Sequence, residues 1–107
     1  MSKRKVLQMP IKAKWFKMIL DRDKREEYRE KDGVYSRRIQ KAKEANEPFT
    51  HLELVNGYGK HRPWMIIELT HELFFTGVES WGAVRGEQYH VLVMGDIEET
   101  GNLELLK

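Results

Sequence analysis

The hydrophobic pattern of the first half of the chain predicts two short helices, each preceded by a strand. A β-prone run covers 6–12, and the apolar spacing then changes to a helical period over 13–21. A strand is expected over 26–30 and a second helix over 34–45. The apolar helix faces are Trp15, Phe16, Ile19 and Leu20 in the first and Tyr35, Ile39 and Ala42 in the second. Helices this short need tertiary packing to hold them, and we expect the first to plug one end of a barrel.

The second half of the chain alternates in the manner of β-strands. Strands are expected over 50–56, over 64–75 with a bend near 70–72, and over 88–97. The last of these is apolar on both faces, which is typical of a central strand; residues 103–107 form a final short strand or a tail. The expected core is Trp15, Phe16, Ile19, Leu20, Ile66, Val91 and Val93.

Together these elements predict an α+β fold: a small β-barrel of five or six mostly antiparallel strands with two early helices. The length of 107 residues corresponds to a single domain over 1–107. There is no cysteine, which excludes disulfides and thiol catalysis and suits the cytoplasm. No apolar stretch reaches the roughly 18 residues of a membrane helix, so no membrane partner is expected.

Charge is distributed unevenly along the chain. Residues 1–62 hold 17 Lys/Arg and 9 Asp/Glu, whereas residues 63–107 hold 2 and 8. A basic half would attract phosphates at long range. Alternatively, the two halves intermix in one fold and partly cancel.

The densest polar chemistry lies at Lys24, Glu27 and Arg29. Strand alternation places Glu27 and Arg29 on one face, so Lys24 must lie in the preceding turn to join them. A lysine near an apolar wall loses its proton more easily and can serve as a base or nucleophile, whereas a nearby carboxylate holds it protonated as an anion clamp. Arg29 stays charged and binds an anion or a carbonyl edge. The alternative is a solvated edge strand with cross-strand ion pairs.

Glu68 is the second candidate catalytic group. It shares a strand face with Trp64 and Ile66, so its carboxylate should be paired, with Lys24 or Arg29 as partner. Lys24, Glu27, Arg29 and Glu68 are therefore expected to converge on one cleft, with Trp64 or Tyr35 as a stacking surface. An outward position facing an exposed lysine is the alternative for Glu68.

Further candidate ligand-binding residues flank these groups. Tyr35 and Arg38 are three positions apart at the start of the second helix and can stack a base and bind a phosphate. Alternatively, Tyr35 belongs to the core and the arginines face solvent. The glycine-bearing loop over 56–60 is interpreted first as a long hairpin connection, with Tyr58 and Lys60 as candidate ligand contacts. The four histidines show no metal-binding spacing, so neither a metal nor a cofactor is expected.

Lys24, Glu27 and Arg29 fit the pattern Gly-x-Lys-x-x-Glu-x-Arg, with Arg22 at the position of the glycine. In this motif and in the order of its elements, the chain resembles the ASCH-domain family of PUA-like β-barrels over about residues 6–98. The segment 35–38 and the loop over 56–60 resemble small phage or prophage members of that family. The resemblance implies a cleft lined by the Lys-to-Arg motif.

The resemblance also implies the candidate functions. Family members include RNA-associated domains, a reported ribonuclease and an amidohydrolase acting on acetylated cytidine, which has a threonine where this chain has Glu27. The leading hypothesis is a binding module for RNA, single-stranded nucleic acid or a modified nucleoside. The alternatives are a nucleotide-directed hydrolase using Lys24 with Glu27 or Glu68, and a phage accessory domain that contacts other proteins.

Overall fold

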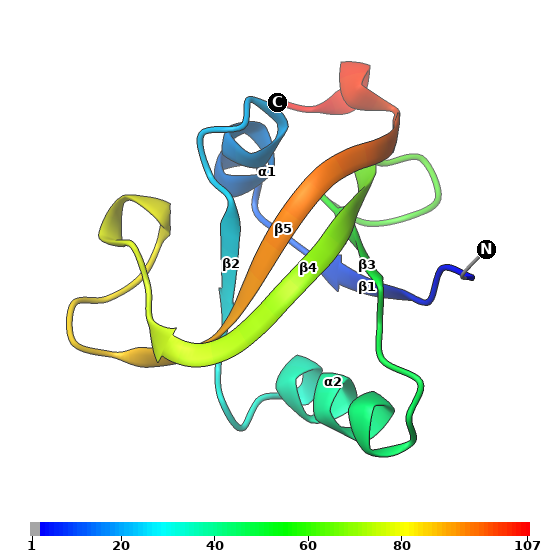
Figure 1. Ribbon diagram of the computed structural model, residues 1–107. Helices are drawn as coiled ribbons and strands as arrows, with labels where there is room; N and C mark the ends of the chain where they lie inside the picture. The colour runs from blue at the N-terminus through cyan, green and yellow to red at the C-terminus, as the bar shows by residue number, and fades with distance from the viewer. Residues whose placement is uncertain (1–2) are drawn as a thin grey trace.

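The computed structural model describes residues 3–107, and its helices and strands follow one another in the order that the sequence pattern predicts (Figure 1). The residues that follow Gly101 form a short 3-10 turn instead of a strand. The elements are β1 Val6–Pro10, α1 Ala13–Leu20, β2 Glu26–Arg29, α2 Val34–Glu44, β3 His51–Val55, β4 Trp64–Thr76 and β5 Gln88–Gly101, with 3-10 turns at Glu79–Trp81 and Leu103–Leu105.

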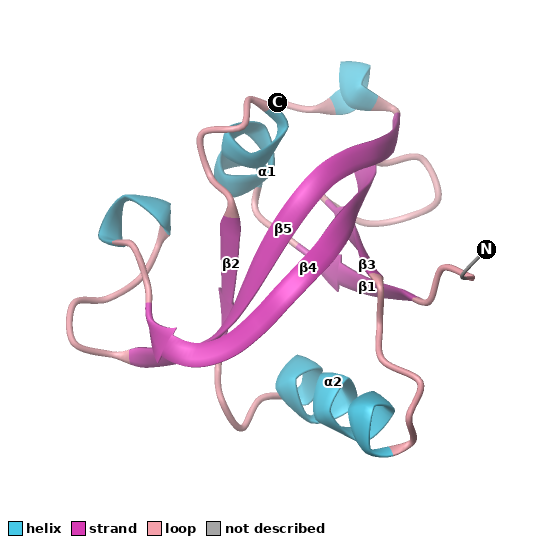
Figure 2. Ribbon diagram, viewed as in Figure 1, coloured by secondary structure: helices cyan, strands magenta, loops and turns pink. Residues whose placement is uncertain are grey.

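The strands form one curled, five-stranded sheet in the order β1-β3-β4-β5-β2 (Figure 2). β1 pairs with β3 in parallel, and all other neighbouring pairs are antiparallel. The sheet curls into a half-barrel with the two helices near its opposite ends (Figure 1). The predicted α+β class with mostly antiparallel strands and two early helices is confirmed.

The core lies between the concave face of the sheet and the two helices. Phe16 and Ile19 enter it from α1 and Ile39 enters it from α2, each with at most 1% of its surface exposed. The strands contribute Leu7, Met9, Leu52, Leu54, Met65, Ile67, Leu92 and Met94. None of the helices within residues 3–107 is long and apolar enough to cross a membrane.

The core prediction is confirmed for three residues and changed for the others. Phe16, Ile19 and Val91 are buried, whereas Trp15, Leu20, Ile66 and Val93 are only partly buried. For β4 the prediction chose the wrong face: Met65 and Ile67 point into the core and Ile66 points to the other side. The error arises because residues 65–67 are all apolar, so alternation could not identify the inner face.

β4 bends where its pairing with β5 is irregular. The register shifts between Ile66 and Ile67, between Ile67 and Leu69, and again between Leu69 and His71. Such bulges bend a strand and increase its twist. β4 pairs with β3 only up to Glu68, and beyond that its strand partner is β5 alone.

Candidate functional site

Lys24 reaches its position because the chain folds back tightly onto the end of α1. The N–H groups of Asp23 and Lys24 both donate to the Met18 carbonyl, at 2.8 and 3.1 Å. Arg22 has a left-handed backbone conformation with φ of 69°, which glycine adopts without steric cost. The ASCH pattern has its glycine at this position. Lys24 therefore sits in the turn before β2, as strand alternation required.

Lys24, Glu27 and Arg29 form a continuous chain of opposite charges, called here the ion chain. Lys24 Nζ lies 3.3 Å from Glu27 Oε1, and Arg29 Nη2 lies 2.6 Å from Glu27 Oε2. Arg29 Nη2 also donates to the Pro10 carbonyl at 2.8 Å, which ties β2 to the end of β1. Only 2% of Lys24 and 6% of Glu27 is exposed. This is an internal network, not the solvated edge-strand pairing that was the alternative.

Aromatic rings surround the Lys24 ammonium group. Nζ lies 5.2 Å from the Trp15 ring centroid and 4.8 Å from that of Tyr28, and it donates to the Trp81 carbonyl at 2.7 Å. Burial lowers the pKa of Lys24 below its usual value, and the Glu27 carboxylate opposes this shift only in part. Burial likewise raises the pKa of Tyr28. Both shifts favour the uncharged forms of these groups.

The loop over 77–87 covers Lys24 and is held in place by side chains from β2 and β5. The N–H of Val78 donates to the Tyr28 hydroxyl at 2.8 Å, and the N–H of Val84 donates to the Tyr89 hydroxyl at 3.0 Å. Gly77 is needed here, because a Cβ at this position would lie 2.6 Å from the Tyr28 ring. Figure 1 shows this loop in yellow beside β2.

An open pocket of about 340 Å³ adjoins the ion chain. We call it the tyrosine pocket; its lining is Tyr28, Arg29, Glu30, Gly33, Val34, Tyr35 and Tyr89. The Arg29 guanidinium lies 5.2 Å from the Tyr35 ring centroid, and the rings of Tyr28 and Tyr89 are 5.6 Å apart. Arg29 and Tyr28 thus belong to both the pocket and the surroundings of Lys24.

Glu68 is not part of this arrangement, so the predicted convergence of four charged residues is wrong for this residue. Glu27 pairs with Leu92 and points to the core side of the sheet, whereas Glu68 lies between the core residues Ile67 and Leu69 and points to the other side. Its carboxylate accepts a hydrogen bond from the N–H of Asp96 at 2.8 Å. Since Glu68 shares a face with Ile66, the misassignment of β4 explains this error too.

The other candidate ligand-binding residues are spread over the molecule. Tyr35 lines the tyrosine pocket, and Arg38 lies on the exposed side of α2 next to it. The Trp64 ring packs against the backbone of Gly101, at the far end of the β4–β5 pair. Tyr58 is 97% exposed and Lys60 is exposed, in the loop between β3 and β4. These last three residues do not belong to the tyrosine pocket.

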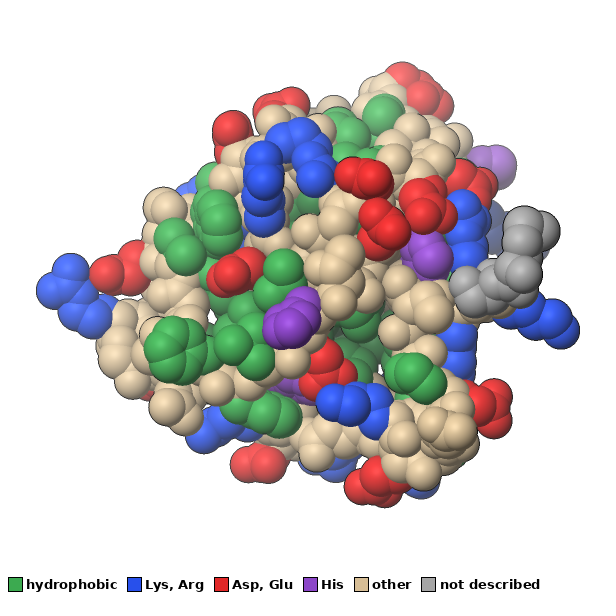
Figure 3. Space-filling model, viewed as in Figure 1, with side chains coloured by type: hydrophobic (Ala, Val, Ile, Leu, Met, Phe, Trp, Pro, Cys, Tyr) green, Lys and Arg blue, Asp and Glu red, His purple; other side chains and the backbone are tan. Residues whose placement is uncertain are grey.

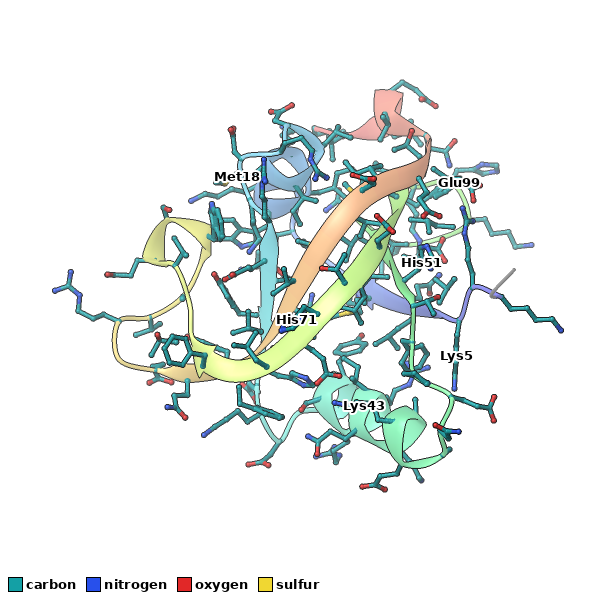
Figure 4. All side chains as sticks on the ribbon, viewed as in Figure 1. Lys5, Met18, Lys43, His51, His71 and Glu99 are labelled. Atoms are coloured by element: carbon teal, nitrogen blue, oxygen red, sulfur yellow. The ribbon has the colours of Figure 1, made fainter. Side chains whose placement is uncertain are left out.

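Sequence reasoning missed a second polar cluster, beneath α2. His90 is fully buried; its Nδ1 lies 2.8 Å from Ser36 Oγ and its Nε2 lies 2.9 Å from Glu72 Oε1. Lys43 reaches the same carboxylate at 3.4 Å, from the helix that Figure 4 shows below β4. Ser36 is fully buried as well, so this serine cannot meet a substrate. The cluster joins α2 to the sheet.

Within residues 3–107, no group of three or more His, Asp or Glu side chains is placed to hold a metal ion. No protein-family model, curated protein or solved structure matches the chain. The ion chain and the tyrosine pocket are therefore the features from which a function can be inferred.

The lowered pKa of Lys24 leads to a pH-dependent stability. Between that lowered pKa and the usual value of 10.5, the unfolded chain binds more protons than the folded one, so stability from this group rises with pH. We expect the free energy of unfolding of the wild type, minus that of Lys24→Met, to increase as the pH rises toward 10.5. Urea unfolding of both proteins measures it; a difference independent of pH would contradict a desolvated lysine.

Proposed function

We propose that this chain binds RNA or a nucleotide, with a base in the tyrosine pocket. The observation that carries the proposal is the pocket itself: three tyrosines and an arginine surround a space of about 340 Å³. Aromatic faces stack bases with little regard to their identity, at about 1–3 kcal/mol per base. An arginine lying over a tyrosine adds a planar donor surface to the same pocket.

Arg29 has unused hydrogen-bonding capacity. Its Nη2 donates to the Glu27 carboxylate and to the Pro10 carbonyl, but its buried Nε has no acceptor among residues 3–107. A buried donor without an acceptor costs free energy. Nε itself has almost no accessible surface, so a carbonyl or ring nitrogen of a bound base would accept from another nitrogen of the guanidinium, whose side chain is 19% exposed.

Phosphate attraction would come from α2. Its exposed side begins at Val34, which also lines the tyrosine pocket. The cationic residues on it and just before it are Lys31, Arg37, Arg38 and Lys41, and Asp32 and Glu44 line the same surface. A base in the pocket would therefore place its phosphates beside positive charge.

We also propose that the chain is an ASCH-type domain. The half-barrel, the position of Lys24 in the turn before β2, and the left-handed backbone at Arg22 all support this proposal. Base stacking in the tyrosine pocket does not require membership of this family.

Binding is tested by titrating the protein with nucleoside monophosphates and short oligoribonucleotides while following tyrosine and tryptophan fluorescence. Tyr35→Ala should weaken binding by about 5- to 150-fold, the equivalent of one lost stacking contact. Arg38→Ala should reduce the salt dependence of oligonucleotide binding by about 0.7 in the log-log slope. Lys60→Ala removes the same charge from the loop between β3 and β4 and should change neither. Binding that is equally affected by Lys60→Ala and Tyr35→Ala would reject the pocket as the site.

A hydrolase is the second candidate, because burial lowers the pKa of Lys24 and so favours a lysine base. In this structure Nζ is occupied by Glu27 and by the Trp81 carbonyl, so the loop over 77–87 would have to move first. Product analysis with acetylated cytidine and RNA distinguishes the two: turnover that is lost in Lys24→Met supports the enzyme, and binding without turnover supports the module.

A further inference from the structure

The outer half of β4 is an edge strand within the sheet. β3 pairs with β4 only as far as Glu68, and the last backbone bond on that side runs from the N–H of Leu69 to the Thr50 carbonyl. Residues 71–76 have β5 as their only strand partner among the described residues. The bulges over 66–71 direct this half away from β3. Locally the sheet therefore has three strands, with β4 on one edge and β2 on the other.

The outer part of this edge has few of the features that usually protect an edge strand from pairing. Natural edges carry lysine, proline, bulges or inward-pointing charges; the bulges of β4 end at His71, and the segment 70–76 has no lysine and no proline. It exposes Leu73 by 38%, Phe74 by 45% and Phe75 by 57%. Its single charged residue, Glu72, already binds His90 and Lys43.

The apolar surface continues from the strand into the loop that follows. Val78 and Val84 are 41% and 60% exposed there. Figure 3 shows hydrophobic side chains gathered over the lower end of β4 and beside this loop, and Figure 4 places His71 at the margin of that area. A contiguous exposed apolar patch of this kind marks an interaction surface.

We propose that a second copy of this chain pairs with this edge through its own residues 70–76, giving a two-fold symmetric dimer with a continuous sheet. Antiparallel pairing about a two-fold axis at Leu73 sets Leu73 opposite the same residue of the second copy. It also sets Phe75 opposite His71 and Phe74 opposite Glu72, so no like charges face each other. A self-complementary patch of this kind is the requirement for an isologous interface.

The dimer leaves the tyrosine pocket free. The pocket lies at β2, on the far side of β5 from the β4 edge. Each copy would therefore carry one accessible pocket at an outer edge of the joined sheet. The inference does not depend on the proposed nucleotide binding.

Charge exchange at the two-fold axis tests the dimer and its register together. Light scattering and sedimentation equilibrium of the wild type should give twice the 12.7 kDa chain mass at high concentration and dissociation on dilution. Leu73→Lys alone and Leu73→Glu alone should each shift the chain to the monomer, because like charges would meet at the axis. An equimolar mixture of the two variants should recover the dimer.

Leu105→Lys is the matched control. It adds the same charge at a leucine that is 44% exposed in the 3-10 turn after β5, at the opposite end of the β4–β5 pair from residues 70–76, and should leave the dimer intact. Circular dichroism melts check that each variant is folded. A wild type that stays monomeric up to millimolar concentration would overturn the proposal, as would a dimer that persists in both single variants. If the mixture of the two variants stayed monomeric, the proposed register at Leu73 would be overturned.

Discussion

Replacing Glu27 with alanine is expected to lower the free energy of unfolding by about 3–5 kcal/mol, the usual result of removing one partner from a buried ion pair. Among residues 3–107, Glu27 is the only carboxylate that contacts both Lys24 and Arg29, and it is 6% exposed. Without it, two positive charges remain in a space closed by Trp15, Tyr28 and the loop over 77–87. Urea unfolding followed by circular dichroism measures the loss.

The control removes both members of the innermost pair. In Lys24→Met combined with Glu27→Leu, the buried ammonium group is removed together with the carboxylate, so only Arg29 loses its ionic partner, and it keeps its bond to the Pro10 carbonyl. Replacing a buried pair by apolar side chains of similar size is often neutral, so this double variant should recover part of the stability lost in Glu27→Ala. A loss below about 1 kcal/mol in Glu27→Ala would instead indicate the weak coupling of a solvated pair.

Strand alternation predicted the local geometry of the ion chain correctly because all three residues lie within six positions. Glu27 and Arg29 had to share a face, and Lys24 could join them only from the turn. The same local reasoning located both helices, whose apolar faces are well defined. What the residues bind or catalyse stays a prediction, since geometry alone does not test it.

The partners that complete the site come from distant parts of the chain, where spacing gives no information. Trp81 closes over Lys24 from a loop 57 positions away, and Tyr89 joins the tyrosine pocket from β5. In the sequence pattern, Tyr89 is indistinguishable from the other apolar residues of a central strand. Only the pairing of β2 with β5 brings it beside Tyr28. His90 was equally hidden, because its contacts with Ser36 and Glu72 depend on how α2 lies on the sheet.

The second large expected effect is a difference in stability between substitutions on the two faces of β4. Met65→Ala should lower the free energy of unfolding by about 2–5 kcal/mol, the usual range for truncating a core methionine, because Met65 is fully buried. Ile66→Ala should cost only about 1 kcal/mol, since this side chain is partly exposed and leaves no closed cavity.

The two substitutions are adjacent on one strand and both remove an apolar side chain, so each serves as the control for the other. Differences in strand propensity between the variants are small beside the expected gap. Thermal and urea unfolding of the two proteins under the same conditions measure that gap. Equal losses would mean that both faces of β4 are packed, and a larger loss in Ile66→Ala would restore the face that alternation with Glu68 had suggested. That outcome would also return Glu68 to the side of the sheet that carries Lys24.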